Sequence, residues 1–309
     1  MIEFFSALVR WLQLTANLVL FGSYVFLAII WYEKKLPELG WARKLEQLFP
    51  WLVTIVLLGL IGILASTAGQ ATGNAINTWD LTAWVEIMLK TRVGHLWVVR
   101  FLLTMLLLFI VLRLRHLDRV RWHYVLLAFA AALPLVAGSL VSHAGAEEIS
   151  FASVAPYTLH ILLAGAWFGV LPAILYIIRE AVRNSQTGAA VVYADFLKQF
   201  STLALPIMIL LFMTGWMAAD RMIGDYYHTL VSSQYGWLLN IKLLILSIIL
   251  WIAYRIRFIW LPLFIREGEH TGIAIGQLRK WVGIEFSLAL ILVLVASLLA
   301  NTLPGKHAI

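Results

Sequence analysis

Residues 48–67 read LFPWLVTIVLLGLIGILAST, twenty consecutive positions without a charged side chain. A helix of about 20 apolar residues matches the thickness of the hydrocarbon core of a bilayer. A helix is expected because backbone polar groups in lipid must be hydrogen-bonded within their own segment. This stretch therefore predicts a membrane-spanning helix and sets the class of the fold.

Seven further stretches along the chain have the same character. Together with the first they predict spans at 11–32, 48–67, 94–114, 122–142, 154–178, 200–219, 237–260 and 282–302. The connecting segments are too short to form a soluble domain. We therefore predict an all-α polytopic membrane protein with eight transmembrane helices.

The composition supports this class and excludes others. Of the 309 residues, 62% are apolar and 13% are charged, whereas a soluble domain is about half apolar and about a quarter charged. A soluble enzyme and a disordered protein are excluded. The chain has no cysteine, which excludes disulfides and thiolate metal sites. Phosphate-loop, serine-hydrolase and zinc-protease motifs are absent, so we expect no enzymatic activity.

The basic residues predict the orientation. Sixteen of the 23 lysines and arginines follow spans 1, 3, 5 and 7. Cytoplasmic loops of membrane proteins are enriched in Lys and Arg. We therefore expect those loops in the cytoplasm and both termini outside. The net charge of +7 then records orientation, and no nucleic-acid partner is expected.

An internal repeat is visible in the sequence. Residues 91–100 align with 233–242, and residues 12–22 align with 159–169. The alignment matches Gln13 with His160. It predicts two parallel four-helix halves, at 1–142 and 143–309; chance alignment of Leu-rich helices is the alternative. Amphipathic residues 79–90 should lie along the outer interface, with 225–234 as their counterpart.

Three histidines fall on the predicted outer side. His95 opens the third span, His143 closes the fourth, and His160 lies about two turns inside the fifth. A short loop joins spans 4 and 5, so His143 and His160 should reach one binding site. Ionisable groups at membrane depth are costly and often mark a site. The alternative is that each imidazole bonds a backbone carbonyl.

Two methionines suggest which metal such a site would take. Met213 and Met217 are four residues apart, hence on one helix face, and we expect them deeper than the histidines. Thioethers suit Cu(I), and imidazole suits copper generally. A copper ion, Cu⁺ or Cu²⁺, is the chemically sensible cargo for a His/Met site without thiolates. The alternative is that both methionines fill packing gaps.

Other polar residues could belong to a pathway. Gln13 and Asn17 share a face of the first span. Glu147 and Glu148 could draw a cation to the entrance of the pathway, or they could form a solvated loop. Glu285, in the eighth span, is either a proton or cation stop or a partner of a neighbouring basic residue, Arg279 or Lys280. The remaining basic pair at membrane depth, Arg100 and Lys242, is expected to snorkel to the interface.

Several segments together resemble the copper resistance protein D (CopD) family. Residues 159–169, LHILLAGAWFG, are similar to its histidine/tryptophan/glycine helix. The segments 142–144, 200–215, 235–242 and 278–285 are similar to further family motifs. The resemblance extends over nearly the whole chain in matching order, and it includes Trp167 with His160.

The resemblance implies a multi-pass protein of the bacterial plasma (inner) membrane. It further implies copper transport towards the cytoplasm and copper resistance. The family's periplasmic copper-binding partner, of the copper resistance protein C type, is expected to be a separate protein here, because the chain starts directly at the first span.

Two rival readings remain open. Four-helix membrane bundles with facing histidines also hold b-type haem, so His95, His143 and His160 could be axial ligands in a membrane oxidoreductase. The chain could instead be a non-transporting membrane partner that docks a copper chaperone. The direction of transport, its energy source and the oligomeric state are not given by the sequence.

Overall fold

The computed structural model describes residues 2–30, 40–114, 120–141, 151–183, 189–224, 227–267 and 272–302. Within these ranges the chain is helical and contains no strand. The long helices are α1 (Ile2–Ile30), α2 (Gly40–Thr72), α4 (Arg92–Leu114), α5 (Arg121–Ser139), α7 (Phe151–Phe168), α9 (Ala189–Ile223), α11 (Gln234–Arg255) and α13 (Gly272–Leu299). The shorter ones are η3 (Ala75–Trp79), α3 (Leu81–Lys90), α8 (Leu171–Arg183), α10 (Thr229–Ser232), η4 (Ile256–Trp260) and α12 (Leu261–Glu267).

Eight helical segments of the described chain are long and apolar enough to cross a membrane. This confirms the predicted number of spans, but the bounds differ. The first span begins at Ile2 instead of residue 11. A polar side chain in its second turn does not end the helix because it faces a neighbour. Ser6 is buried and accepts a hydrogen bond from Ser66 of α2 at 3.3 Å.

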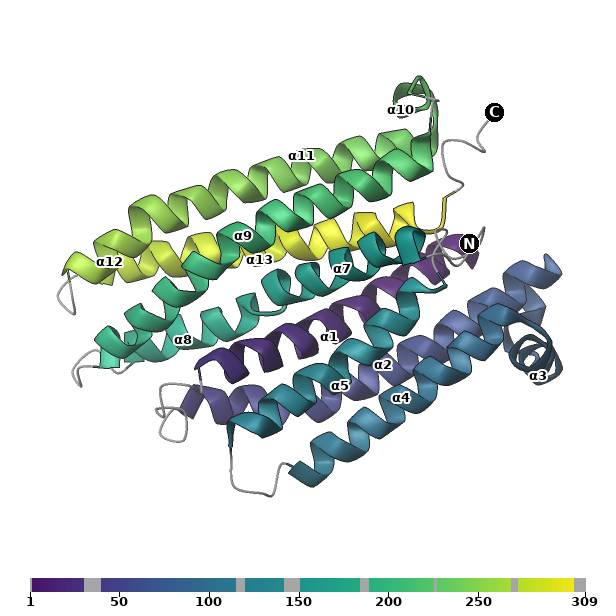
Figure 1. Cartoon of the computed structure of the whole chain (residues 1–309), viewed down its shortest axis with the longest axis horizontal. Helices are drawn as coiled ribbons and strands as arrows, with labels where there is room; N and C mark the ends of the chain where they lie inside the picture. The colour runs from purple at the N-terminus through teal and green to yellow at the C-terminus, as the bar shows by residue number, and fades with distance from the viewer. Residues whose placement is uncertain are drawn as a thin grey trace.

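The helices form two groups that lie side by side (Figure 1). The first half consists of α1, α2, α4 and α5, and the second of α7 to α13. The start of α1, the end of α13, α3 and α10 lie at the same end of the bundle, while α12 lies at the opposite end. We call the first of these the termini end.

Glycines hold the two halves together where α1 meets α7. A Cβ added to Gly22 would lie 2.1 Å from the carbonyl oxygen of Gly165, and one added to Gly169 would lie 2.0 Å from that of Leu18. The backbones can approach this closely only because these residues lack side chains. Ser23 of α1 also donates a hydrogen bond to the Gly169 carbonyl at 3.1 Å.

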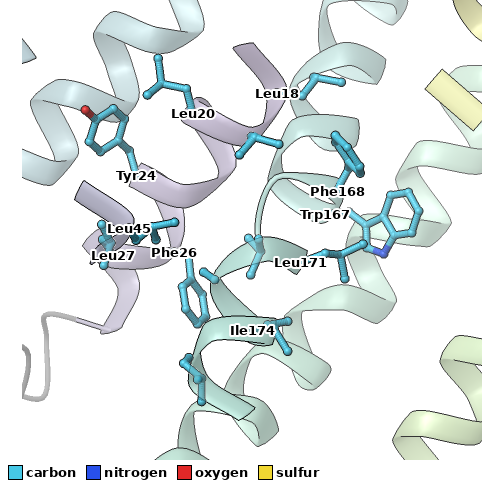
Figure 2. Close-up of a cluster of buried hydrophobic side chains, with 14 of the residues drawn as sticks. Leu18, Leu20, Tyr24, Phe26, Leu27, Leu45, Trp167, Phe168, Leu171 and Ile174 are labelled. Atoms are coloured by element: carbon cyan, nitrogen blue, oxygen red, sulfur yellow. The ribbon is translucent and has the colours of Figure 1, made fainter. Parts of the chain in front are cut away.

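Large apolar side chains surround this glycine contact. Figure 2 shows Leu18, Leu20, Tyr24, Phe26 and Leu27 of α1 beside Leu45, Trp167, Phe168, Leu171 and Ile174. All of them are buried. The main core of the molecule therefore lies at the joint between the halves, around the C-terminal end of α7.

The two halves differ in how tightly their helices pack. In the first, α2 packs on α4 and α4 on α5, which closes the group around α1. In the second, α9 packs on α7, α8 and α12, and α11 packs on α13, but α9 and α11 make few contacts with each other. Little of α9 and α11 is buried, and the same holds for α4 of the first half. The second half is the looser bundle in that α9 and α11 make few contacts with each other, whereas α2 packs on α4.

Candidate functional site

Matching turns set the depth of α4 and α11 in the bundle. Thr91 accepts a hydrogen bond from the Gly94 amide, and Ser233 accepts one from the Gly236 amide, each at 3.0 Å. A Cβ on either glycine would collide with a backbone carbonyl of the preceding short helix. Each long helix therefore starts tightly against α3 or α10. The basic residue six positions after each glycine is placed at the same depth.

His160 of α7 is held by α9. Its Nδ1 lies 3.1 Å from the carbonyl oxygen of Leu211 and 3.1 Å from the hydroxyl of Thr214. Because a carbonyl only accepts, Nδ1 carries the proton and donates. The other ring nitrogen, Nε2, then keeps its lone pair, which is the form in which imidazole binds a metal.

Gly215 makes room for this ring. A Cβ at Gly215 would lie 3.0 Å from Cε1 of His160, closer than ordinary van der Waals contact. The Thr214 hydroxyl is itself fixed, because it donates to the Leu210 carbonyl at 2.8 Å. The pair Thr214–Gly215 therefore forms a rigid seat that orients the imidazole.

Two further groups lie near His160 at the termini end. The ammonium group of Lys242 on α11 is close enough to act electrostatically on the imidazole. Tyr157, about one turn before His160, donates a hydrogen bond to the Ala218 carbonyl at 3.2 Å. It packs against a small apolar cluster that includes the buried thioether of Met222.

Trp167 and Glu285 form a second buried contact, between α7 and α13. Their exposed fractions are 4% and 5%, and the Trp167 indole donates a hydrogen bond to the Glu285 carboxyl group. Glu285 lacks the expected basic partner, because the side chains of Arg279 and Lys280 are exposed on the other side of α13. The described salt bridges join other residues, Lys44 to Glu180 and Lys90 to Glu86.

The first half holds a polar cluster of different chemistry. Gln13 is 2% exposed and Asn17 is fully buried. Arg100 Nη2 donates to Gln13 Oε1 at 3.4 Å. The prediction that Arg100 snorkels to the interface is wrong, because the guanidinium turns into the bundle. Gly138 of α5 leaves room for it, since a Cβ there would lie 3.3 Å from Nη2.

Three predicted ligands do not join His160. His95 is exposed and its Nε2 donates to the Leu89 carbonyl at 3.0 Å, so it belongs to the first half. Met213 and Met217 are 55% and 46% exposed. They lie at the same level of α9 as the His160 seat, not deeper, and on the opposite face, because residues 211 and 214 point towards α7.

Other predicted residues lie outside the described ranges, namely His143, Glu147 and Glu148. Among the described residues, no three His, Asp or Glu side chains come together as a metal cluster. Of the predicted ligands among the described residues, only His160 is held between two helices of the bundle. The sequence did not indicate the Thr214 seat or the buried Met222. The only signal in the sequence for this seat was the pair Thr214–Gly215, on the spanning helix that follows the one with His160.

Comparison with known proteins adds the family. The model described as "Copper resistance protein D-like, N-terminal domain" matches residues 1–154. The model described as "Copper resistance protein D" matches residues 194–299. No curated protein and no solved structure matches the chain. The first match covers the first half of the chain, and the second match falls in the second half. The chain belongs to the copper resistance protein D family.

Proposed function

We propose that this protein moves copper from the outer side of a bacterial inner membrane towards the cytoplasm, with His160 as the central ligand. The family connects the chain with copper resistance at a membrane. The observation that carries the proposal is the anchored imidazole. Its Nδ1 is held by the Leu211 carbonyl, and Nε2 remains for the metal. Metal-binding histidines commonly donate their second ring nitrogen in this way.

The path inward follows one face of α7. His160 and Trp167 are seven residues apart, so they lie on the same helix face, about 10 Å apart along the axis. The Trp167 indole contacts Glu285, whose carboxyl group is buried in the middle of α13. The path therefore leads from Trp167 to this carboxyl group. A cation that leaves His160 would next meet this carboxyl group, which acts as a cation or proton stop.

In this proposal the entrance is formed by His143, Glu147 and Glu148, which follow α5 in the sequence and lie outside the described residues. His143 lies only a few positions before α7 in the sequence, so its imidazole is the expected second ligand. The carboxylates would attract a cation from solution, delivered by a separate periplasmic copper-binding protein. The two termini then face the outside, as the distribution of basic residues favours.

Lys242 limits how strongly copper is held. In its charged form, Lys242 acts electrostatically on His160 and repels a cation bound there. Transport requires binding that is favourable enough for entry and weak enough for exit. Lys242 therefore favours release over storage, which supports a transport role over that of a copper reservoir.

The contacts of the histidines weigh against haem. The His160 ring rests against Gly215 of α9, and His95 bonds a carbonyl of α3. A haem would need two imidazoles that face one plane from opposite sides. These two engage different helices in different halves, so the redox alternative lacks its ligand pair among the described residues.

The test is copper binding and uptake by the purified chain. We expect stoichiometric Cu(I) binding, measured by competition with a chromophoric chelator, and copper uptake into proteoliposomes. His160→Ala should abolish both, while His123→Ala, at the opposite end of the bundle, should retain them. Equal copper uptake by the His160→Ala variant would contradict the proposal. An intense Soret band in the purified protein would instead favour the haem reading.

A further inference from the structure

The polar cluster of the first half contains buried atoms without partners. Gln13 Nε2, both amide atoms of Asn17 and Arg100 Nε are inaccessible to solvent, and no described residue bonds them. Buried polar groups are nearly always hydrogen-bonded, and an unpaired one costs about 1–3 kcal/mol. Several of them in one cluster indicate a ligand.

The chemistry of these atoms points to an anion. Three of the four unpaired atoms, Gln13 Nε2, Asn17 Nδ2 and Arg100 Nε, are donors, and only Asn17 Oδ1 is an acceptor. The Arg100 guanidinium also lies close enough to that of Arg10 for the two charges to repel each other. Arg10 bonds only a backbone carbonyl, that of Ala300 at 3.3 Å. Among the described residues neither arginine has a carboxylate partner, so two positive charges in the bundle lack a counter-charge.

The surrounding helices hold the donors in place. A Cβ on Gly59 of α2 would lie 2.4 Å from Cβ of Gln13, so α2 covers the amide closely. Gly138 leaves room for the guanidinium from the α5 side. Val56 and Leu60 form a buried apolar cluster beside the donors, with Trp97 and Phe101 packed against it. Such a shell excludes water and strengthens electrostatic attraction.

We propose that the Gln13–Asn17–Arg100 cluster binds a small inorganic anion of the size of chloride. The donors are two amide NH₂ groups and one guanidinium N–H in an apolar shell, and only the guanidinium among them is charged. A phosphate would require more positive charge and more donors than this cluster supplies. A metal cation is disfavoured by the two guanidinium groups. This site is separate from the copper path and does not depend on it.

The experiment measures halide binding by the full chain in detergent. Chloride replaces gluconate at constant ionic strength while thermal unfolding is followed, and ³⁵Cl NMR line width reports binding directly. We expect a saturable rise in Tm of about 3 °C or more, together with line broadening. Both should be lost in Asn17→Leu and in Arg100→Gln. The matched control is Arg92→Gln, an exposed arginine at the start of the same helix, which should respond like the parent.

The outcomes separate the alternatives. If Arg100→Gln does not fold, Asn17→Leu decides, because it removes donors without removing charge. An equal chloride response in Asn17→Leu and the parent would overturn the proposal. The proposal would also be overturned if the parent showed no response to chloride and the Glu147→Gln plus Glu148→Gln variant had a lower Tm than the parent. The two carboxylates would then be the counter-charge of the arginines.

Discussion

The two halves carry a polar pair at aligned positions, and the pairs differ in kind. Gln13 of α1 meets Arg100 of α4, whereas His160 of α7 lies near Lys242 of α11. Each pair also has a glycine of the next helix against it, Gly59 for Gln13 and Gly215 for His160. The scaffold is similar, but only the second pair offers a metal ligand.

The difference in packing accompanies the difference in chemistry. The first half is closed by contacts between α2 and α4, while α9 and α11 of the second half make few contacts with each other. A closed bundle with donors suits a permanently held ligand. A looser bundle with an imidazole suits an ion that enters and leaves. On the functions proposed above, similar helix arrangements would hold a permanent ligand in one half and pass copper in the other.

The largest expected effect comes from making the second half resemble the first. His160→Gln places the residue of position 13 at position 160 and removes the imidazole. We expect Cu(I) affinity to fall about 100-fold, because loss of an oriented ligand costs at least as much as loss of its supporting contacts. Chelator competition measures it. Retained affinity would show that the halves do not differ in metal binding. His123→Ala serves as the control.

The next effect concerns the charge beside the ligand. Lys242→Met removes a cation that opposes copper, and we expect about fivefold tighter binding, equivalent to about 1 kcal/mol of relieved repulsion. Release into proteoliposomes should slow accordingly. Lys198→Met, an exposed lysine of α9, should leave both unchanged. Weaker copper binding in Lys242→Met would instead identify the lysine as a supporting group.

A smaller effect is expected at the seat of the imidazole. Thr214→Val keeps the volume but removes one acceptor of the His160 Nδ1 proton, while the Leu211 carbonyl remains. We expect about threefold weaker Cu(I) binding with little change in stability. Thr202→Val, on an exposed part of the same helix, is the matched control. An effect as large as that of His160→Gln would mean that the threonine itself binds the metal.

The smallest effect is expected from the exposed methionines. Met213→Leu plus Met217→Leu nearly preserves volume, and both side chains face away from His160. We expect copper uptake within twofold of the parent. A large loss would restore the methionine face to the copper path. In that case the copper uptake of a Met222→Leu variant, which changes the buried methionine, would be compared with that of the double variant.

The sequence predicted the number and type of the elements well. Continuous apolar runs are a strong signal, because lipid leaves the backbone no alternative to a helix. The amphipathic segment before Arg92 forms the helix α3 in the structure, and its position along the outer interface stays a prediction. The starts of the spans were misplaced, since residues such as Ser6 look polar in sequence but face a partner helix in the fold.

The site was only partly predictable. His160 stood out as an ionisable group at membrane depth, and its placement in the bundle interior agrees with that interpretation. The exposed face of Met213 and the inward turn of Arg100 could not be predicted. A four-residue spacing shows that two residues share a face, but it does not say which neighbour that face meets. That depends on glycines of other helices, here Gly138 and Gly215.

The glycine contact between α1 and α7 has a mechanical consequence. Backbones that touch at Gly22 and Gly169 cannot slide or rotate without collision, so the halves cannot rock against each other as a hinged pair. The first half and α7 then act as a fixed frame. An opening that admits or releases an ion would then involve α11, which packs on α13 and makes few contacts with α9 or with the frame.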